Sequence, residues 1–242
     1  MSGGNGIERK TPPRHHFRIG HRGASAHEPE NTMLAFRRAL ELGADGLELD
    51  VHLSSDGALV VIHDGTLDKT TSGSGLVSET SLAAIRALDA GKGEQVPLLE
   101  EVIDEFAGQC LLLIEIKGGG SEIPTADMIR AKGVVASVIV SSFDPAKLAA
   151  MKEYAPEIET AVLTGRWDID FVALAAEAKA DCIQFGWERH EAPHTLLTDD
   201  VFRQADDAGL HVMLWHEERP DVIRALDDLP IYGLCGNAPE LL

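Results

Sequence analysis

The segment Gly46–Val51, GLELDV, is the feature that most constrains this chain. Its length and aliphatic content predict a short buried strand. Side chains alternate across a strand, so Glu48 and Asp50 share one face. Two adjacent carboxylates on a buried strand repel each other and are costly to remove from water, and a divalent cation would relieve both costs. The alternative is a strand at a rim whose acids point into solvent, and this segment alone favours neither interpretation.

A second acidic strand favours the metal site. The apolar run Leu111–Lys117, LLLIEIK, places Glu115 and Lys117 on one face at its carboxyl end. Polar residues at the carboxyl ends of parallel strands mark the functional mouth of a β/α barrel. We therefore expect a three-carboxylate site of Glu48, Asp50 and Glu115, with Lys117 beside it as a point charge for an anionic oxygen. Oxygen ligands favour one hard divalent cation, Mg²⁺, Ca²⁺ or Mn²⁺, over Zn²⁺.

A histidine and an arginine follow the first predicted strand, residues 17–20. His21 and Arg22 lie in the sequence Gly-His-Arg-Gly, and the flanking glycines let the backbone turn and let a ligand come close. The guanidinium of Arg22 is a planar fork suited to phosphate. This segment therefore predicts a phosphate-binding position.

His63 ends the apolar run 58–62, which follows the tight-turn sequence Ser-Ser-Asp-Gly at 54–57. Such a short turn joins only antiparallel strands, because a parallel crossover needs about a dozen residues or more. The run therefore folds back as a hairpin and brings His63 over the metal site. Two histidines that flank a metal-bound phosphate suit general acid–base catalysis. The alternative for each is a hydrogen-bonded structural role, which the shared context of His21 and His63 makes the weaker interpretation.

Six segments together resemble the glycerophosphodiester phosphodiesterase family, the phosphatidylinositol phospholipase C-like phosphodiesterase barrels. They are HRGAS, PENT, GADGLELDV, SSDGALVVIHD, VPLLEEV and IEIK, in that order over about half of the chain. The resemblance implies a (β/α)₈ TIM barrel. It also implies roles for seven residues: catalytic His21 and His63, phosphate-contacting Arg22, metal ligands Glu48, Asp50 and Glu115, and substrate-side Lys117.

Two aromatic residues are expected to bind substrate. Trp215 ends the predicted strand 211–215 and should lie over the site, where an aromatic ring can stack on a polyol or shield the pocket. Phe143 closes the predicted strand 136–141 at the mouth, where it packs against glycerol carbons or simply plugs the barrel top. The family often has a similar Ser-Phe at this place.

Two segments depart from the family pattern. Strand seven usually runs into Trp-Thr-Val-Asn, whereas this chain has Trp-His-Glu-Glu at 215–218. Strand eight usually ends in Thr-Asp before a proline, whereas this chain has Gly-Asn-Ala-Pro at 236–239. Both lie away from the histidine and acidic motifs, so they bear on the bound alcohol more than on the reaction. Glu217 and Glu218 would disfavour a second anionic group on the substrate if they face the pocket.

The chain divides into a leader and one domain. Residues 1–16, rich in Gly, Pro and charge, are expected to form a flexible leader. Residues 17–242 have a typical size for one barrel. Because the sequence ends soon after the eighth predicted strand, the helix after that strand can have one turn at most.

Residues 65–96 are expected to form a small insertion after the second strand and its hairpin. Family members similarly carry an insertion here, and long loops in compact domains are usually lids or binding loops. We expect it to form a wall of the pocket for the alcohol part of the substrate. Within it, residues 81–88 are predicted to be a short helix with Ser78 or Thr80 as its N-cap.

The composition restricts partners and location. The formal charge of −19 argues against an extended surface that binds nucleic acid. It also disfavours binding to an anionic membrane. Three cysteines, far apart and odd in number, suggest reduced thiols in a cytosolic protein. No run approaches the ~18 apolar residues of a membrane span. We therefore expect a cytoplasmic enzyme that acts on a small soluble substrate without stable membrane association; the oligomeric state is not readable from the sequence.

The expected activity is metal-dependent hydrolysis of glycerophosphodiesters of the glycerophosphocholine or glycerophosphoethanolamine type, which yields glycerol 3-phosphate and an alcohol. The attacking group is water or the neighbouring glycerol hydroxyl, and the sequence does not distinguish between these two routes. Which histidine is the acid and which the base is equally open. A lysophospholipase D-type phosphodiesterase is the nearest alternative. A catalytically silent barrel that binds a phosphorylated ligand is a weaker one, because both histidines and all three acids are present.

Overall fold

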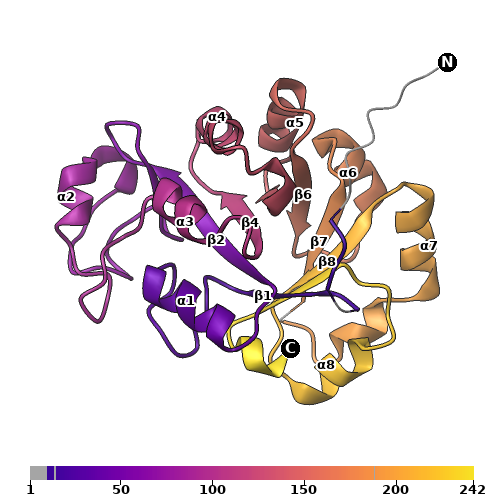
Figure 1. The fold of residues 1–242 in the computed structure, drawn as a ribbon. Coiled ribbons are helices and arrows are strands. Elements are labelled where there is room, and N and C mark those ends of the chain that lie inside the picture. The colour runs from indigo at the N-terminus through magenta and orange to yellow at the C-terminus, as the bar shows by residue number, and fades with distance from the viewer. Residues whose placement is uncertain (1–9, 14, 188) are drawn as a thin grey trace.

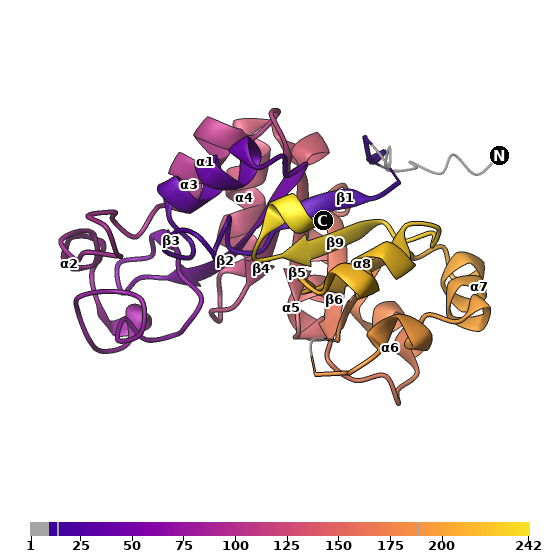
Figure 2. The same ribbon diagram turned by 90° about the horizontal axis from the view of Figure 1, so that it is seen from below.

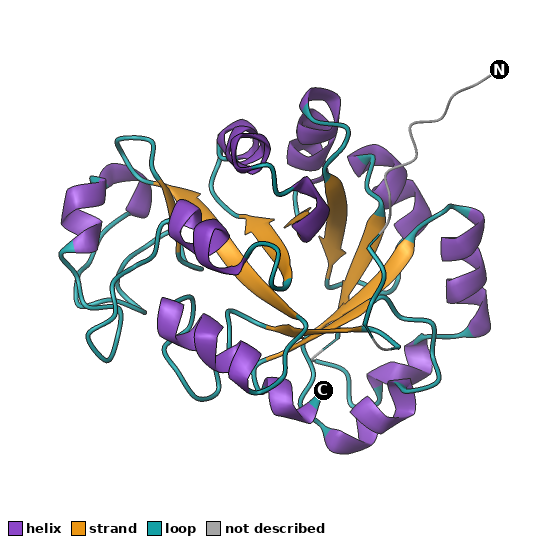
Figure 3. Cartoon of the chain, in the orientation of Figure 1, coloured by secondary structure: helices purple, strands orange, loops and turns teal. Residues whose placement is uncertain are grey.

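The computed structural model describes residues 10–13, 15–187 and 189–242. Within these residues, eight parallel strands form a closed barrel in the order β1-β9-β8-β7-β6-β5-β4-β2, and the pairing of β1 with β2 closes it. Helices lie outside the strands (Figures 1 and 3). The expected (β/α)₈ barrel is therefore confirmed. The barrel strands are β1 Phe17–Gly20, β2 Gly46–Leu53, β4 Leu111–Ile116, β5 Val138–Ser142, β6 Glu159–Thr164, β7 Cys182–Gly186, β8 His211–Trp215 and β9 Gly233–Gly236.

The α-helices alternate with the strands along most of the chain. In the described residues they are α1 Met33–Glu41, α2 Leu82–Arg86, α3 Leu99–Phe106, α4 Glu122–Lys132, α5 Pro145–Tyr154, α6 Phe171–Ala178, α7 Asp199–Asp207 and α8 Pro220–Leu226. After β9 the described residues form a 3₁₀ turn, Pro239–Leu241. Among the described residues, no helix is long and apolar enough to cross a membrane.

The alternation of side chains along each strand separates two hydrophobic cores. On β4, Leu112 and Ile114 face outward into the core shared with the helices, whereas Leu111 and Leu113 face the barrel interior. Glu115 continues the inward series, so its carboxylate enters the barrel at the carboxyl end of the strand. The same parity places Leu47, Leu49 and Val51 of β2 in the outer core and leaves Glu48 and Asp50 facing inward.

The loop between β1 and β2 ends in an N-capped helix. Thr32 Oγ1 accepts a hydrogen bond from the N–H of Ala35, which satisfies one of the free donors in the first turn of α1. Ala35, Phe36 and Ala39 then lie on the face of α1 that the barrel buries. The cap fixes where the preceding loop ends, and that loop carries Glu30 and Asn31 back toward the mouth of the barrel.

The short strand β3, Leu59–Val61, pairs antiparallel with β2 and does not belong to the barrel, as the tight turn predicted. The hairpin and the insertion that follows it share a separate small core, made of Val60, Ile62, Leu67, Val77, Ile85, Ala90 and Val96. Figures 1 and 2 both show α2 at the edge of the molecule. The predicted cap of α2 was wrong: Ser81 Oγ accepts from Ala84, while residues 77–79 form a 3₁₀ turn. The hydroxyl of Thr80 instead donates to the carbonyl of Leu76.

A residue from the expected leader packs against the amino-terminal end of the barrel. Lys10 Nζ lies 2.6 Å from Glu159 Oε2, and both side chains are at most 10% exposed. The carbonyl of Lys10 accepts a hydrogen bond from the hydroxyl of Tyr232 at 2.8 Å. These contacts lie at the end of the barrel opposite the carboxyl ends of the strands.

Candidate active site

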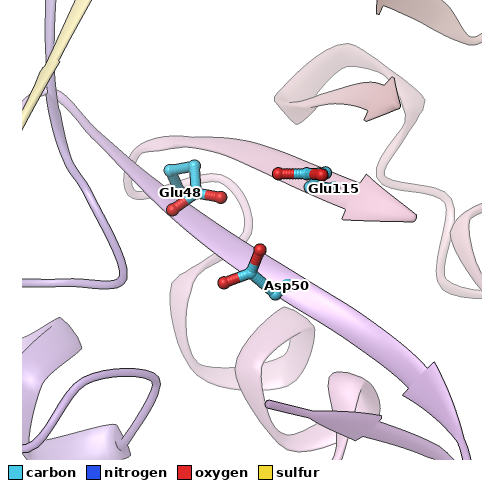
Figure 4. A group of neighbouring side chains, drawn as sticks. All are labelled: Glu48, Asp50 and Glu115. Atoms are coloured by element: carbon cyan, nitrogen blue, oxygen red, sulfur yellow. The ribbon is translucent and has the colours of Figure 1, made fainter. Parts of the chain in front are cut away.

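Three buried carboxylates meet at the carboxyl end of the barrel. Glu48 and Asp50 come from β2 and Glu115 from the adjacent β4, where Asp50 and Glu115 are paired in register. One oxygen of each group lies within 4.8 Å of the others. Figure 4 shows the three side chains directed toward a common space between the strands. The predicted acidic residues are therefore brought together as a cluster.

Burial and mutual repulsion change the ionisation of this cluster. Burial, followed by the charges of Asp50 and Glu115, raises the pKa of Glu48 well above its ordinary value. Burial and Asp50 raise the pKa of Glu115 to about 7. Burial acts in the same direction on Asp50, but Lys117 and Arg22 outweigh it and lower the pKa of that carboxyl. The cluster thus holds more negative charge than its surroundings easily compensate.

Two cations lie against the acids. Arg22 Nε is 3.3 Å from Asp50 Oδ2, and its backbone N–H donates to Glu48 Oε2 at 2.9 Å. Lys117 Nζ is 2.8 Å from Glu115 Oε1 and 3.4 Å from Asp50 Oδ1. The same ammonium lies 5.7 Å from the centre of the Phe143 ring. Both predicted phosphate-binding cations are therefore at the cluster.

The donor set fits a hard divalent cation. Asp50 Oδ1 is buried and has no hydrogen-bond partner among the described residues, although Lys117 lies near it. The other acids supply further oxygens at a spacing that one ion can bridge. An ion there would compensate the repulsion that raises the pKa values of Glu48 and Glu115.

The two histidines come from different elements and line the same cavity. His21 follows β1, and His63 follows the β3 hairpin. The Nδ1 atom of His21 lies 2.7 Å from Asn237 Oδ1, and that of His63 lies 2.6 Å from Asp64 Oδ1. Burial, reinforced by the charge of Arg22, lowers the pKa of His21 to about 3. In each ring the outer contact at Nδ1 leaves Nε2 available to a ligand.

The cavity between these groups has a volume of about 110 Å³. Its walls include both histidines, both cations, Glu48 and Glu115, and are completed by Ser141, Phe143, Leu163, Gln184 and Trp215. Asp50 lies beneath it, only 1% exposed. A neighbouring cavity of about 210 Å³ shares Phe143 and Trp215 as lining residues. The ring centres of Phe143 and Trp215 are 5.6 Å apart, so the two predicted aromatics lie together at the mouth.

Several residues at the site were not assigned there from the sequence. Glu30 pairs with Arg22, and Asn31 binds Asp50, while the next residue, Thr32, caps α1. Their position in the loop after His21 was the available signal. Asp64 holds His63, and its place next to that histidine could have indicated it.

The two segments that depart from the family pattern contact His21. Asn237 binds the His21 ring, and His216 stacks on it with centres 4.9 Å apart and planes at 16°. Their expected effect on the alcohol through Glu217 has no support, because Glu217 is buried and its carboxylate accepts three hydrogen bonds from Arg219. Glu218 accepts from the backbone N–H of Asn237. No local sequence signal relates these segments to His21, since about 200 residues separate them in the chain.

Comparisons with known proteins agree with this geometry. The model of the "Glycerophosphoryl diester phosphodiesterase family" matches residues 21–241. A glycerophosphodiester phosphodiesterase from Caldanaerobacter subterraneus is 44% identical over 93% of this chain and 95% of the relative, and one from Bacillus subtilis is 34% identical over 92% and 84%. The crystal structure of the enzyme from Agrobacterium tumefaciens has a TM-score of 0.82 at 31% identity over 92% of this chain and 96% of its own.

A second solved structure was determined with a ligand. It is a phosphodiesterase from Oleispira antarctica in complex with the product sn-glycerol-3-phosphate, with a TM-score of 0.77 and 25% identity over 92% of this chain and 93% of its own. The range matched by the family model, residues 21–241, contains the histidines, the acidic cluster and both cations. The chain therefore belongs to the glycerophosphoryl diester phosphodiesterase family and is an enzyme of that family.

Proposed function

We propose that this enzyme hydrolyses glycerophosphodiesters of the glycerophosphocholine and glycerophosphoethanolamine type to glycerol 3-phosphate and an alcohol, with a divalent cation held by Glu48, Asp50 and Glu115. One observation carries the proposal: His21 and His63 line a single cavity with two cations and the acidic cluster, each with Nδ1 held from outside. Glycerol 3-phosphate as the product of the Oleispira relative supports the same substrate class.

The cation site completes the phosphate-binding position. The acidic cluster would hold Mg²⁺, Ca²⁺ or Mn²⁺, which supplies positive charge to the non-bridging phosphate oxygens when it is bound. Arg22 and Lys117 share the charge that develops on those oxygens in the transition state. Because both cations are anchored to buried carboxylates, they are already placed before substrate arrives.

The histidines divide the proton transfers. His21 is neutral near pH 7, because burial and Arg22 lower its pKa, and it therefore suits the base that takes a proton from the nucleophile. Asp64 Oδ1 holds Nδ1 of His63 at 2.6 Å, which leaves Nε2 toward the cavity, and we assign His63 as the acid that protonates the leaving alkoxide. The nucleophile is water or the neighbouring glycerol hydroxyl, the second of which would give a cyclic phosphate intermediate.

The mouth provides room for the rest of the substrate. Phe143 and Trp215 line both the catalytic cavity and its neighbour. We assign them to the glycerol and alcohol carbons, where an aromatic face can pack against a polyol. All three cysteines are free thiols, which supports the cytoplasmic location and soluble substrate that we propose.

The test is release of glycerol 3-phosphate from glycerophosphocholine and glycerophosphoethanolamine, with each of the three ions and with EDTA. We expect release that depends on the ion and falls at least about 100-fold in His21→Ala and in His63→Ala, with metal binding retained. His27→Ala is the matched control, because His27 pairs with Glu240 on the surface and does not line the cavity. Full activity in a verified metal-free sample, or near-normal activity of either catalytic variant, would contradict the proposal.

A further inference from the structure

The ring of His21 is held by a side chain from the far end of the sequence. Asn237 Oδ1 lies 2.7 Å from His21 Nδ1, and Ser25 Oγ lies 2.9 Å from the same oxygen. The oxygen of an amide accepts hydrogen bonds and cannot donate them. With this oxygen as its partner, Nδ1 of His21 carries the proton. The lone pair of Nε2 is then directed to the cavity side, where Glu48 Oε2 is 4.0 Å away.

A second residue holds the plane of the same ring. His216 stacks on His21 with ring centres 4.9 Å apart and an interplanar angle of 16°. His216 is not among the described residues that line the catalytic cavity, and we assign its effect to its stack on His21. A stacked ring restricts rotation of the imidazole about its Cβ–Cγ bond, while the bond to Asn237 fixes its direction in the plane.

Glu218 connects these two contacts. Its Oε1 accepts from the backbone N–H of Asn237 at 2.7 Å, and its Oε2 lies 3.9 Å from His216 Nε2. The neighbouring backbone is fixed as well: the N–H of His21 donates to the carbonyl of Gly236 at 2.9 Å, and that of Glu217 donates to Cys235 at 3.1 Å. The contacts therefore form one network around His21.

We propose that Asn237 and His216 are positioning residues that fix the tautomer and plane of His21, so that an unprotonated Nε2 faces the substrate. The proposal relies on the proposed function for the use of His21 as the base. A neutral amide selects the tautomer as a carboxylate would, but it adds no negative charge next to a site that already holds three acids. The two segments that depart from the family pattern thus act on the catalytic histidine.

The first experiment reads the tautomer directly. Enzyme labelled with ¹⁵N-histidine is examined by long-range ¹H–¹⁵N correlation at neutral pH, and His21→Ala identifies the signals. We expect a protonated Nδ1 and an unprotonated Nε2 in the wild type, and a mixture in Asn237→Ala. Asn237→Asp keeps an acceptor and should keep the protonated Nδ1. A wild-type ring protonated at Nε2, or an unchanged pattern in Asn237→Ala, would overturn the proposal. This readout needs no turnover, so it stands apart from any failure of the proposed function.

The second experiment measures kinetics with the holoenzyme. Asn237→Ala should lower kcat about tenfold with KM within about twofold, because a base with mixed tautomers is less often competent while substrate contacts remain. Asn237→Asp should recover part of that loss. His216→Phe preserves a stacked ring and should stay within about threefold of wild type, whereas His216→Ala should lose more. Equal losses in His216→Phe and His216→Ala would assign His216 a role other than stacking and overturn that part; His27→Ala again serves as the surface control.

Discussion

Asn31 exchanges two hydrogen bonds with Asp50: its Nδ2 donates to Oδ2 at 2.8 Å, and its Oδ1 accepts from the Asp50 backbone N–H at 3.3 Å. Asn31 is buried, and its φ of 59° lies in the left-handed region that asparagine and glycine adopt more readily than alanine. The loop after His21 is thereby attached to the strand that carries two of the proposed metal ligands.

We predict that removal of the Asn31 side chain weakens metal binding about tenfold, because groups that orient a ligand contribute on that scale. Asn31→Gly is the decisive variant, since glycine accepts the positive φ without strain. Asn31→Ala adds backbone strain to the same loss. Affinities for Mg²⁺ and Ca²⁺ from calorimetry measure the effect. Wild-type affinity in Asn31→Gly would assign Asn31 a backbone role only.

The metal-free enzyme should show a stability cost from Glu115 that grows with pH. The folded-state pKa of Glu115 is raised from 4.5 to about 7, so between these values the folded protein binds more protons than the unfolded chain. The free energy of unfolding therefore falls, through this group, as pH rises from 4.5 to 7. His21 contributes with the opposite sign between about 3 and 6.5, because its folded-state pKa is lowered.

Glu115→Gln separates the two contributions, since it removes the titrating carboxyl of Glu115 and leaves His21 in place. In EDTA, the difference in Tm between this variant and wild type should grow in favour of the variant as pH rises. The increase from pH 5 to pH 8 should be at least about 3 °C. Thermal unfolding by circular dichroism at both values measures the difference. An advantage of Glu115→Gln that stays constant with pH would show that Glu115 ionises normally.

Lys10→Ala should destabilise the barrel without loss of catalysis. The change leaves the carboxylate of Glu159 buried and without its cation, which typically costs 3–5 kcal/mol, here about 3 because Lys10 remains 10% exposed. The double variant Lys10→Ala/Glu159→Gln removes the charge as well and should recover part of the loss. Arg166→Ala, which breaks an ion pair in which both side chains are mostly exposed, is the control and should change stability little. Chemical denaturation measures the series.

Gly186→Ala should disturb the mouth through Trp215. A Cβ at Gly186 would lie 2.6 Å from Cζ2 of Trp215, so the indole must move. We expect KM to rise about threefold or more with a smaller change in kcat, because the substrate carbons lose a wall while the acid–base groups stay in place. Gly165→Ala is a matched control: it lines the same neighbouring cavity, and its Cβ would meet nothing within 4 Å. Equal kinetics of the two variants would argue against Trp215 as a substrate contact.

The barrel and its acidic cluster could be predicted because both depend on local periodicity. The alternation in LLLIEIK and GLELDV determines which side chains enter the barrel, and the parallel register then brings Asp50 beside Glu115. The antiparallel hairpin followed equally from a turn too short for a crossover. Within each segment, the pattern behind the prediction spans only a few neighbouring positions.

The support around His21 could not be predicted in this way. Asn237 and His216 reach it only because β1 pairs with β9 and the barrel closes. The cap of α2 was misplaced for a different reason: Ser78, Thr80 and Ser81 are all suitable cap residues, and tertiary packing of the insertion selects among them. A local sequence pattern does not show which distant residues the closed barrel brings together. It also does not show which of several suitable cap residues is used.

The position of β3 outside the barrel has a consequence for heat tolerance. His21 follows a barrel strand, whereas His63 follows Ile62, which is packed in the small core of the insertion. Small cores open locally at a lower free energy than the global unfolding of a domain. Opening of the insertion would separate the two proposed catalytic histidines while all eight barrel strands stay paired. We therefore expect activity to be lost on heating before the barrel melts, when the small core shared by the hairpin and the insertion opens.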